Sequence, residues 1–327
     1  MDDPLHLCPC HLPTKQATAT TKNPDMTQAR ADNPLYTRAY AAMDRGDLAA
    51  AQRYFSKLIR ETPQNRHYHY MYALASKYRG DWTGALTHNL RAIALAAEHD
   101  DAPYWNAGIA ATALEDWAKA RRLWRACGIA VPEGTGPISG NYGIAAIRLH
   151  PWAATSETVL ARRIDPVRAR LLGVPHPASG HRFGDIILHD SVPTGYRQHN
   201  GMEIPEYSEL ARLKPSPYPT YTARVRCTDA TELQPLLDDG ASGDIACIEA
   251  RPVDSDGSIT LDIAAKTRLA VAQLLCDWAL AADSRSLEHI SSEELPVPPP
   301  DGHPHWWLAP KNTAPLPAAD RTVHTAP

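Results

Sequence analysis

One block of sequence is written three times between Pro34 and Pro132, and this repetition constrains the fold more than any other feature. The copies are 34 and 35 residues apart. In each copy an alanine follows a large side chain by three residues, and a third marked position follows the alanine by four residues. The three sets are Leu48, Ala51, Phe55; Trp82, Ala85, Asn89; and Trp117, Ala120, Trp124. A period near 34 with a small residue at a fixed slot predicts helix pairs stacked as a solenoid, because two helices pass closest at the small side chain.

The pattern resembles the tetratricopeptide repeat family. The first helix of each copy has a small residue where the family has one (Ala39, Ala73, Gly108), and the turn slot holds Gly46, Gly80 and Glu115. Pro63 and Pro132 close copies one and three, whereas Ala97 stands at that slot in copy two, and Asn89 replaces an aromatic residue. The resemblance implies an N-terminal α-solenoid of about three helix pairs over residues 34–132.

In this family the first helix of each pair lines the concave side of the solenoid, and its outward slots set what can bind. Carried across, those slots hold Tyr36, Tyr40, Met43, His67, Tyr70, Tyr78, Trp105, Asn106 and Ile109. Only Asn106 would fit a clamp for a terminal carboxylate, so we do not expect that partner class. A ring-lined groove with few charges suits an extended or helical peptide with apolar anchors. The alternative is that the chain's own second half covers these rings.

The sequence changes character after Pro132. Residues 133–142, rich in Gly and Pro, are expected to be a linker, and residues 143–290 a mainly β domain with one or two helices, giving an α+β chain. Expected strands are 144–149, 158–164, 168–174, 185–189 and 220–227, with a hairpin tip over 195–204 around Asn200-Gly201 and helices at 231–238 and 266–282. We expect Leu269, Ala272, Leu275, Cys276 and Ala279 to share one side of the last helix.

The stretches 162–170 and 180–190 resemble bacterial proteins that join tetratricopeptide repeats to an uncharacterised β-rich domain. That resemblance covers residues 33–227 and implies no activity.

Both ends of the chain are expected to be disordered, over residues 1–33 and the Pro-rich tail 291–327. His6, Cys8, Cys10 and His11 could hold a zinc ion, but zinc sites usually take two separated ligand pairs from a folded frame, so we predict no metal there. Met26 is a second candidate for the start of the chain. In the tail, Trp306 and Trp307 could dock a partner, fold back onto the groove, or have no role.

The bulk composition narrows the class of protein. A formal net charge of -4 argues against a general nucleic-acid or membrane binder, since either usually needs a basic face. There is no apolar run of 18 residues and no signal-peptide pattern. The six cysteines, four of them in apolar segments, predict small buried thiols rather than a disulfide framework. We therefore expect a cytoplasmic protein.

Catalytic signals are weak. His181, Asp185 and His189, with Asp190 beside them, could bind a metal or exchange protons, but residues four apart on a strand are about 13 Å apart. We expect instead that the two aspartates end strands or cap turns and that both histidines lie at the surface. The arginines of this region could form a basic face for RNA or an acidic protein, or pair with Asp165, Glu157 or Asp185; they are Arg162, Arg163, Arg168, Arg170 and Arg182. No catalytic motif is present, and no cofactor is expected.

Three hypotheses follow. The first is an adaptor that binds a protein or peptide partner in the groove. The second is an immunity-type inhibitor of a toxin, which would have one tight partner. The third is an enzyme with a site near Asp185 and His189.

Overall fold

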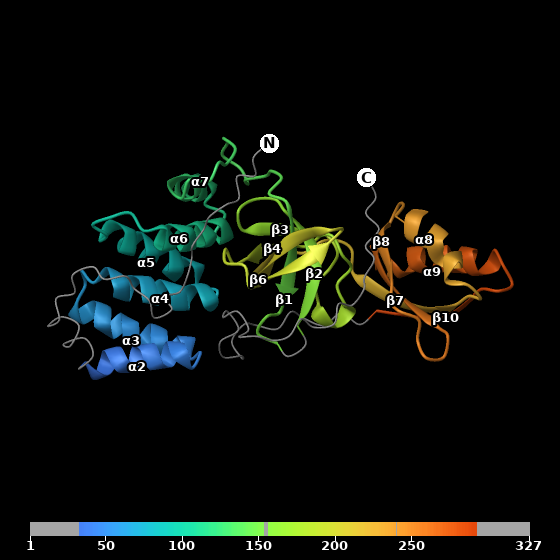
Figure 1. Ribbon diagram of the computed structural model, residues 1–327, viewed down its shortest axis with the longest axis horizontal. Helices are drawn as coiled ribbons and strands as arrows, with labels where there is room; N and C mark the ends of the chain where they lie inside the picture. Colours follow the sequence, from blue (N-terminus) through green and yellow to red (C-terminus); the bar gives the residue numbers. More distant parts are fainter. Residues whose placement is uncertain (1–32, 154–155, 240, 293–327) are drawn as a thin grey trace.

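The computed structural model describes residues 33–153, 156–239 and 241–292. Six helices are followed by a β-rich region with two helices, which confirms the expected α+β class and its order along the chain (Figure 1). The expectations about the two chain ends, including the His6 to His11 cluster, Met26 and Trp306-Trp307, lie outside the described residues.

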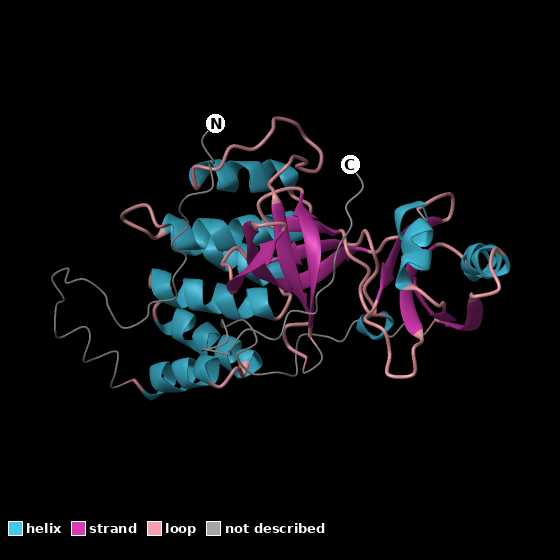
Figure 2. Ribbon diagram, turned by 45° about the vertical axis from the view of Figure 1, so that its right-hand side comes forward, coloured by secondary structure: helices cyan, strands magenta, loops and turns pink. Residues whose placement is uncertain are grey.

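The six helices form three consecutive hairpins that stack side by side (Figures 1 and 2). Their bounds are α2 Pro34–Asp44, α3 Leu48–Glu61, α4 Arg66–Tyr78, α5 Trp82–Ala94, α6 Asp101–Ala113 and α7 Trp117–Ala126. Each helix packs on the next along the chain, as the repeat predicts.

The turn inside each hairpin is built in the same way three times. An aspartate caps the second helix by accepting a hydrogen bond from the backbone N–H three residues on; the caps are Asp47, Asp81 and Asp116. The residue before each aspartate is left-handed, with φ of 77° at Gly46, 71° at Gly80 and 57° at Glu115. The threefold register is therefore kept, although the third copy uses a residue with a side chain where glycine is favoured.

The small residues lie where helices meet most closely. Ala51, Ala85 and Ala120 are all fully buried. At Gly108 on α6, an added Cβ would stand 2.6 Å from the indole ring of Trp124 on α7, closer than real Cβ contacts allow. The close approach predicted from the small slots is confirmed. Asn89 is also buried, and its side-chain amide donates to the backbone carbonyl of Ala85.

A six-stranded sheet follows the helices. Its strands are β1 Ile144–Leu149, β2 Glu157–Arg163, β3 Arg168–Leu171, β4 Ile186–His189, β5 Gly195–His199 and β6 Met202–Lys214. The order is β1-β2-β3-β4-β6-β5, and a parallel pairing of β1 with β6 closes the sheet into a barrel. Alternate residues such as Ile147, Ala161 and Tyr207 form its interior cluster.

The expected hairpin is confirmed. Asn200 and Gly201 join β5 to β6 with φ of 48° and 74°, the left-handed pair that a two-residue hairpin turn requires.

A second sheet lies farther along the chain and has its own core. It comprises β7 Thr220–Arg226, β8 Ile245–Ala250, β9 Ile259–Ala265 and β10 Ser286–Ser291, with α8 Gln234–Asp239 and α9 Arg268–Leu280. The chain order β-α-β-β-α-β and the antiparallel strand order β10-β7-β9-β8 give the split βαβ, ferredoxin-like arrangement. We expected one β-rich unit over 143–290; the structure has a barrel and a separate sheet.

The face predicted for the last helix is only partly right, because Leu275, Ala272 and Ala279 pack into the core but Leu269 and Cys276 do not. Val271, Leu275 and Trp278 of α9 are buried, whereas Leu269 is 75% exposed and Cys276 is also exposed. The other described cysteines, Cys127, Cys227 and Cys247, are half-buried free thiols.

The barrel packs against the helical repeat. Trp152, Val167, Leu188 and Leu210 belong to the same buried cluster as residues of the six helices. Both views place the barrel next to the hairpins and the second sheet beyond it (Figures 1 and 2). No helix in the described residues has the length and apolar character needed to cross a bilayer.

Candidate functional site

The ring-bearing residues predicted to line the groove do lie together on the first helices of the hairpins. Tyr36 and Tyr40 of α2 have ring centroids 4.3 Å apart, and Tyr40 stacks on His67 of α4 with centroids 5.9 Å apart. Farther along, the side-chain amide of Asn106 on α6 donates to the hydroxyl of Tyr70 on α4, at 3.5 Å. These contacts link neighbouring first helices, α2 to α4 through Tyr40 and His67, and α4 to α6 through Tyr70 and Asn106.

Five members of this row keep part of their side-chain surface exposed: Tyr36, Tyr40, His67, Tyr70 and Trp105 are all half-buried. The ring of Trp105 also meets Trp124 edge-on, with centroids 5.1 Å apart, so that side chain supports the third hairpin as well. We call the five residues the ring row.

For the other four predicted groove residues, the expectation of an outward-facing side chain is wrong. Met43, Tyr78, Asn106 and Ile109 are buried, Ile109 completely. The hydroxyl of Tyr78 donates to Asp190 at the end of β4, at 3.0 Å. The barrel therefore covers Tyr78 at the C-terminus of α4, in line with the alternative that the chain's own second half covers some of the predicted residues.

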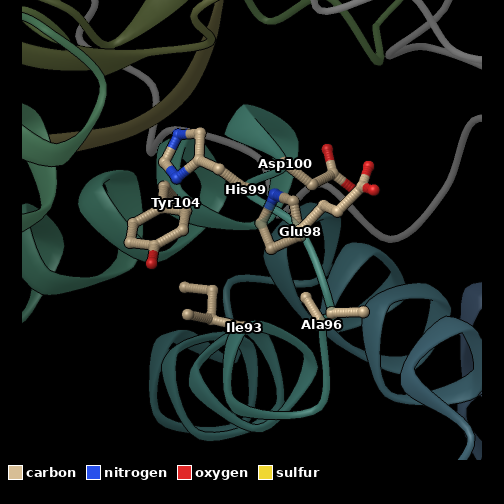
Figure 3. A pocket seen from close by; sticks show the side chains of 8 residues that line it. Ile93, Ala96, Glu98, His99, Asp100 and Tyr104 are labelled. Atoms are coloured by element: carbon tan, nitrogen blue, oxygen red, sulfur yellow. The ribbon is translucent and has the colours of Figure 1, made fainter.

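A separate small pocket lies in the connection between α5 and α6, lined by Ile93, Ala96, His99, Tyr104 and their neighbours (Figure 3). Two of its polar side chains are already engaged, because Asp100 pairs with Arg66 and His99 lies against Asp101. We assign no function to it.

The barrel holds a buried cluster of two imidazoles and a carboxylate: His150, His181 and Glu209, whose candidate ligand atoms all lie within 4.8 Å of one another. Nε2 of His181 is 2.8 Å from Oε1 of Glu209, and the backbone N–H of His150 donates to Oε2 at 2.9 Å. Nε2 of His150 is buried without a hydrogen-bond partner. We call these three residues the His-Glu cluster.

The two imidazoles have different pKa values because their surroundings differ. Burial lowers the pKa of His150 to about 4, so this ring is neutral. Burial also lowers the pKa of His181, but the hydrogen bond to Glu209 and the charge of that carboxylate outweigh it, and the pKa ends raised. Asp185 lies nearby, with its pKa raised by burial, and Arg212 approaches it at 3.5 Å.

The four residues singled out in the sequence do not form one site: His181 lies near Asp185, whereas His189 and Asp190 lie at the end of β4. Asp185 caps a turn, accepting from the backbone N–H groups of Arg182 and Ser216, and Asp190 follows β4, as predicted for both. The prediction that the histidines lie at the surface is wrong, since His181 is 1% and His189 0% exposed. His189 stacks on Tyr207 with centroids 4.6 Å apart, and burial lowers its pKa to about 3.

The arginines of this region favour the ion-pair interpretation at Arg168, which pairs with Asp165 and lies over the indole ring of Trp117 on α7. Arg163 is also buried and donates to the carbonyl of Pro166. Arg162 and Arg170 are exposed.

His150 and Glu209 escaped the sequence analysis because they are 59 residues apart. The parallel pairing of β1 with β6, in which Arg148 stands opposite Ser208, brings them together. The available signals were a histidine directly after an expected strand and a glutamate followed by Leu210 and Ala211, and neither signal specifies the partner.

Comparison with known proteins adds little. No protein family matches the chain, and no curated protein is significantly similar to it. One solved structure it is similar to is described as "Novel crystal structure of a hypothetical protein from Neisseria gonorrhoeae". That likeness has a TM-score of 0.21 and 9% identity, and covers 47% of this chain and 94% of the other. At this TM-score it supports no argument about fold or function.

Proposed function

We propose that this protein is a bacterial, cytoplasmic adaptor of the tetratricopeptide type, which binds a peptide segment of a protein partner along the ring row. The observation that carries the proposal is the row itself: half-exposed aromatic and imidazole rings run from α2 through α4 to α6 on the first helix of each hairpin. The turns recur at the same position in all three hairpins, and the small residues of the repeat are buried; both features support a repeat of the tetratricopeptide type.

The chemistry of the row favours a segment with apolar or aromatic anchors. Aromatic side chains supply large contact areas at low conformational cost and are frequent binding hot spots. The five members include no carboxylate or ammonium group, so charge pairing would contribute little. Because Tyr78 is engaged with Asp190, we place the binding segment over α2, α4 and the start of α6 rather than at the barrel end.

The experiment is a selection of displayed random peptides on the immobilised full chain. We expect enriched sequences with two or more apolar or aromatic residues at helical or extended spacing. A parallel selection uses a Tyr36→Ala/Tyr70→Ala variant, with Tyr196→Ala as the matched control, since Tyr196 is a 62% exposed tyrosine on β5. Enrichment that survives in the double variant would overturn the ring row as the site, and enrichment of acidic or basic peptides without apolar anchors would overturn the proposed partner chemistry.

A further inference from the structure

We propose that the His-Glu cluster is a binding site for one divalent transition-metal ion, of which zinc is the representative, held inside the barrel by His150, His181 and Glu209. The site is independent of the ring row and of the proposed adaptor function.

The donor set fits such an ion. Two imidazole nitrogens and one carboxylate oxygen are donors that zinc and related ions take, and three protein donors leave a further position for water or another small ligand. The three residues are 3%, 1% and 0% exposed, and their donor atoms already converge within 4.8 Å. Surface clusters of acidic groups converge without any ligand, but a buried one must satisfy its polar atoms.

One atom of the cluster is left unsatisfied. Nε2 of His150 is buried and has no hydrogen-bond partner. Leaving a buried polar atom unpaired is unfavourable, because the atom loses its hydrogen bonds to water and gains none in the protein. A coordinated cation would accept the lone pair of this nitrogen and remove that cost.

His181 is arranged as metal-binding histidines usually are. Its Nδ1 is 3.3 Å from the backbone carbonyl of Ser179, while its Nε2 faces Glu209. Metal ligands commonly donate the second ring N–H to a backbone carbonyl, which fixes the ring and directs the other nitrogen at the ion. Without a metal, both nitrogens face acceptors, so both must carry protons; with a metal, the ion takes the place of the Nε2 proton.

The surrounding charge also favours a cation. Glu209 and Asp185 are two carboxylates, and Arg212 is the nearby guanidinium. When His181 gives up its Nε2 proton to become a ligand, Glu209, Asp185 and Arg212 together leave one negative charge in a buried region, and the bound cation would compensate it. Protonation of His181 would also compensate it, and this metal-free state is the competing outcome of the test.

The test measures metal in the full chain, purified with a tag free of histidine. Metal analysis after incubation with Zn²⁺ and gel filtration is expected to give about one equivalent. Zinc at about 100 times its Kd should raise Tm by roughly 5 °C relative to chelator-treated protein. X-ray absorption of the zinc-loaded wild-type chain should show nitrogen and oxygen ligands without sulfur.

Two variants locate the ion. His150→Ala should lose the equivalent and the Tm response, whereas Cys8→Ser/Cys10→Ser should keep both, which separates this site from the N-terminal His6 to His11 cluster. Glu209→Gln serves as a second disruption should His150→Ala fail to fold, and the X-ray absorption arm requires no substitution. The proposal is overturned by no bound metal with an unchanged Tm, by sulfur ligation, or by loss of the metal in the cysteine variant.

Discussion

Nζ of Lys77 on α4 lies 3.1 Å from both carboxylate oxygens of Asp190 at the end of β4, across 113 residues of sequence. The two side chains are 3% and 8% exposed, and Tyr78 donates to the same carboxylate. This buried pair joins the helical repeat to the barrel. It also places the barrel against the C-terminal end of α4.

Removing the ammonium group of Lys77 should lower the free energy of unfolding substantially. Lys77→Met leaves the Asp190 carboxylate buried without its counter-charge, which typically costs about 3–5 kcal/mol of unfolding free energy. Urea unfolding of the full chain measures it. Lys119→Met is the matched control, because Lys119 pairs with Asp116 at a half-exposed site and should lose at most about 1 kcal/mol. Equal losses in the two variants would contradict the interface described here.

Gly108 offers a test in which two effects have opposite signs. Glycine to alanine inside a helix normally stabilises by about 1 kcal/mol. At Gly108 the new methyl group would stand 2.6 Å from Trp124, so we expect Gly108→Ala to destabilise by about 1–3 kcal/mol. Gly136→Ala is the control, because no atom lies within 4 Å of the added group there. A Tm that rises in Gly108→Ala would refute the close approach of α6 and α7.

A substitution in the turn of the third hairpin should raise the stability of the protein. Glu115 has φ of 57°, a conformation that costs a residue with a Cβ about 1–2 kcal/mol, offset in part by the greater entropy of glycine in the unfolded chain. We expect Glu115→Gly to stabilise the protein by about 0.5–1 kcal/mol. Gly80→Ala, at φ of 71°, should destabilise it by a similar amount. Calorimetry of the two variants measures both changes in Tm, and shifts in the same direction would contradict the strain assigned to Glu115.

The helical repeat should weaken in acid through His88. Burial, and next the nearby His69, lower the pKa of His88 to about 4, while Asp81 opposes them. The folded pKa is below the unfolded value of about 6.5, so the unfolded chain binds more protons as pH falls from 6.5 to 4, and stability declines across that window. Because the ring is half-exposed, the loss should be on the order of 1 kcal/mol.

The control for this pH dependence is His88→Gln, which cannot titrate and should show a smaller loss between pH 6.5 and 4. Denaturation midpoints at several pH values measure both proteins. Identical slopes would exclude His88 as the source.

The helical half could be predicted closely from sequence because its information is local and repeated. The alanine position of Ala51 and the start of each second helix recur three times, and the turn glycine recurs twice, so an error at one copy is corrected by the others. Asp47, Asp81 and Asp116 also recur at one position of the repeat, but their role as helix caps was not predicted.

The β region could be predicted only where its signals are local. The Asn200-Gly201 turn and the strand at 144–149 were predicted, whereas the part of β6 beyond residue 204 was not; Pro205 lies in it, and proline is unusual inside a strand. Pro205 stands opposite Tyr196 of β5 in the hairpin. The closure of β1 on β6, and with it the His-Glu cluster, depends on a long-range register that no short stretch encodes.

The buried face of α9 was predicted only in part, and for a different reason. Its sequence is apolar on several sides, so periodicity does not select the side with Val271 and Trp278 over the side with Leu269.

The most direct test of the central claim is the affinity of a selected peptide, measured by calorimetry, for the wild-type chain and for Tyr36→Ala/Tyr70→Ala. Loss of aromatic hot spots worth about 2 kcal/mol or more predicts at least a roughly 30-fold rise in Kd, with Tyr196→Ala unchanged. A double variant that stays folded and binds the peptide as tightly as wild type would contradict the ring row as the binding site.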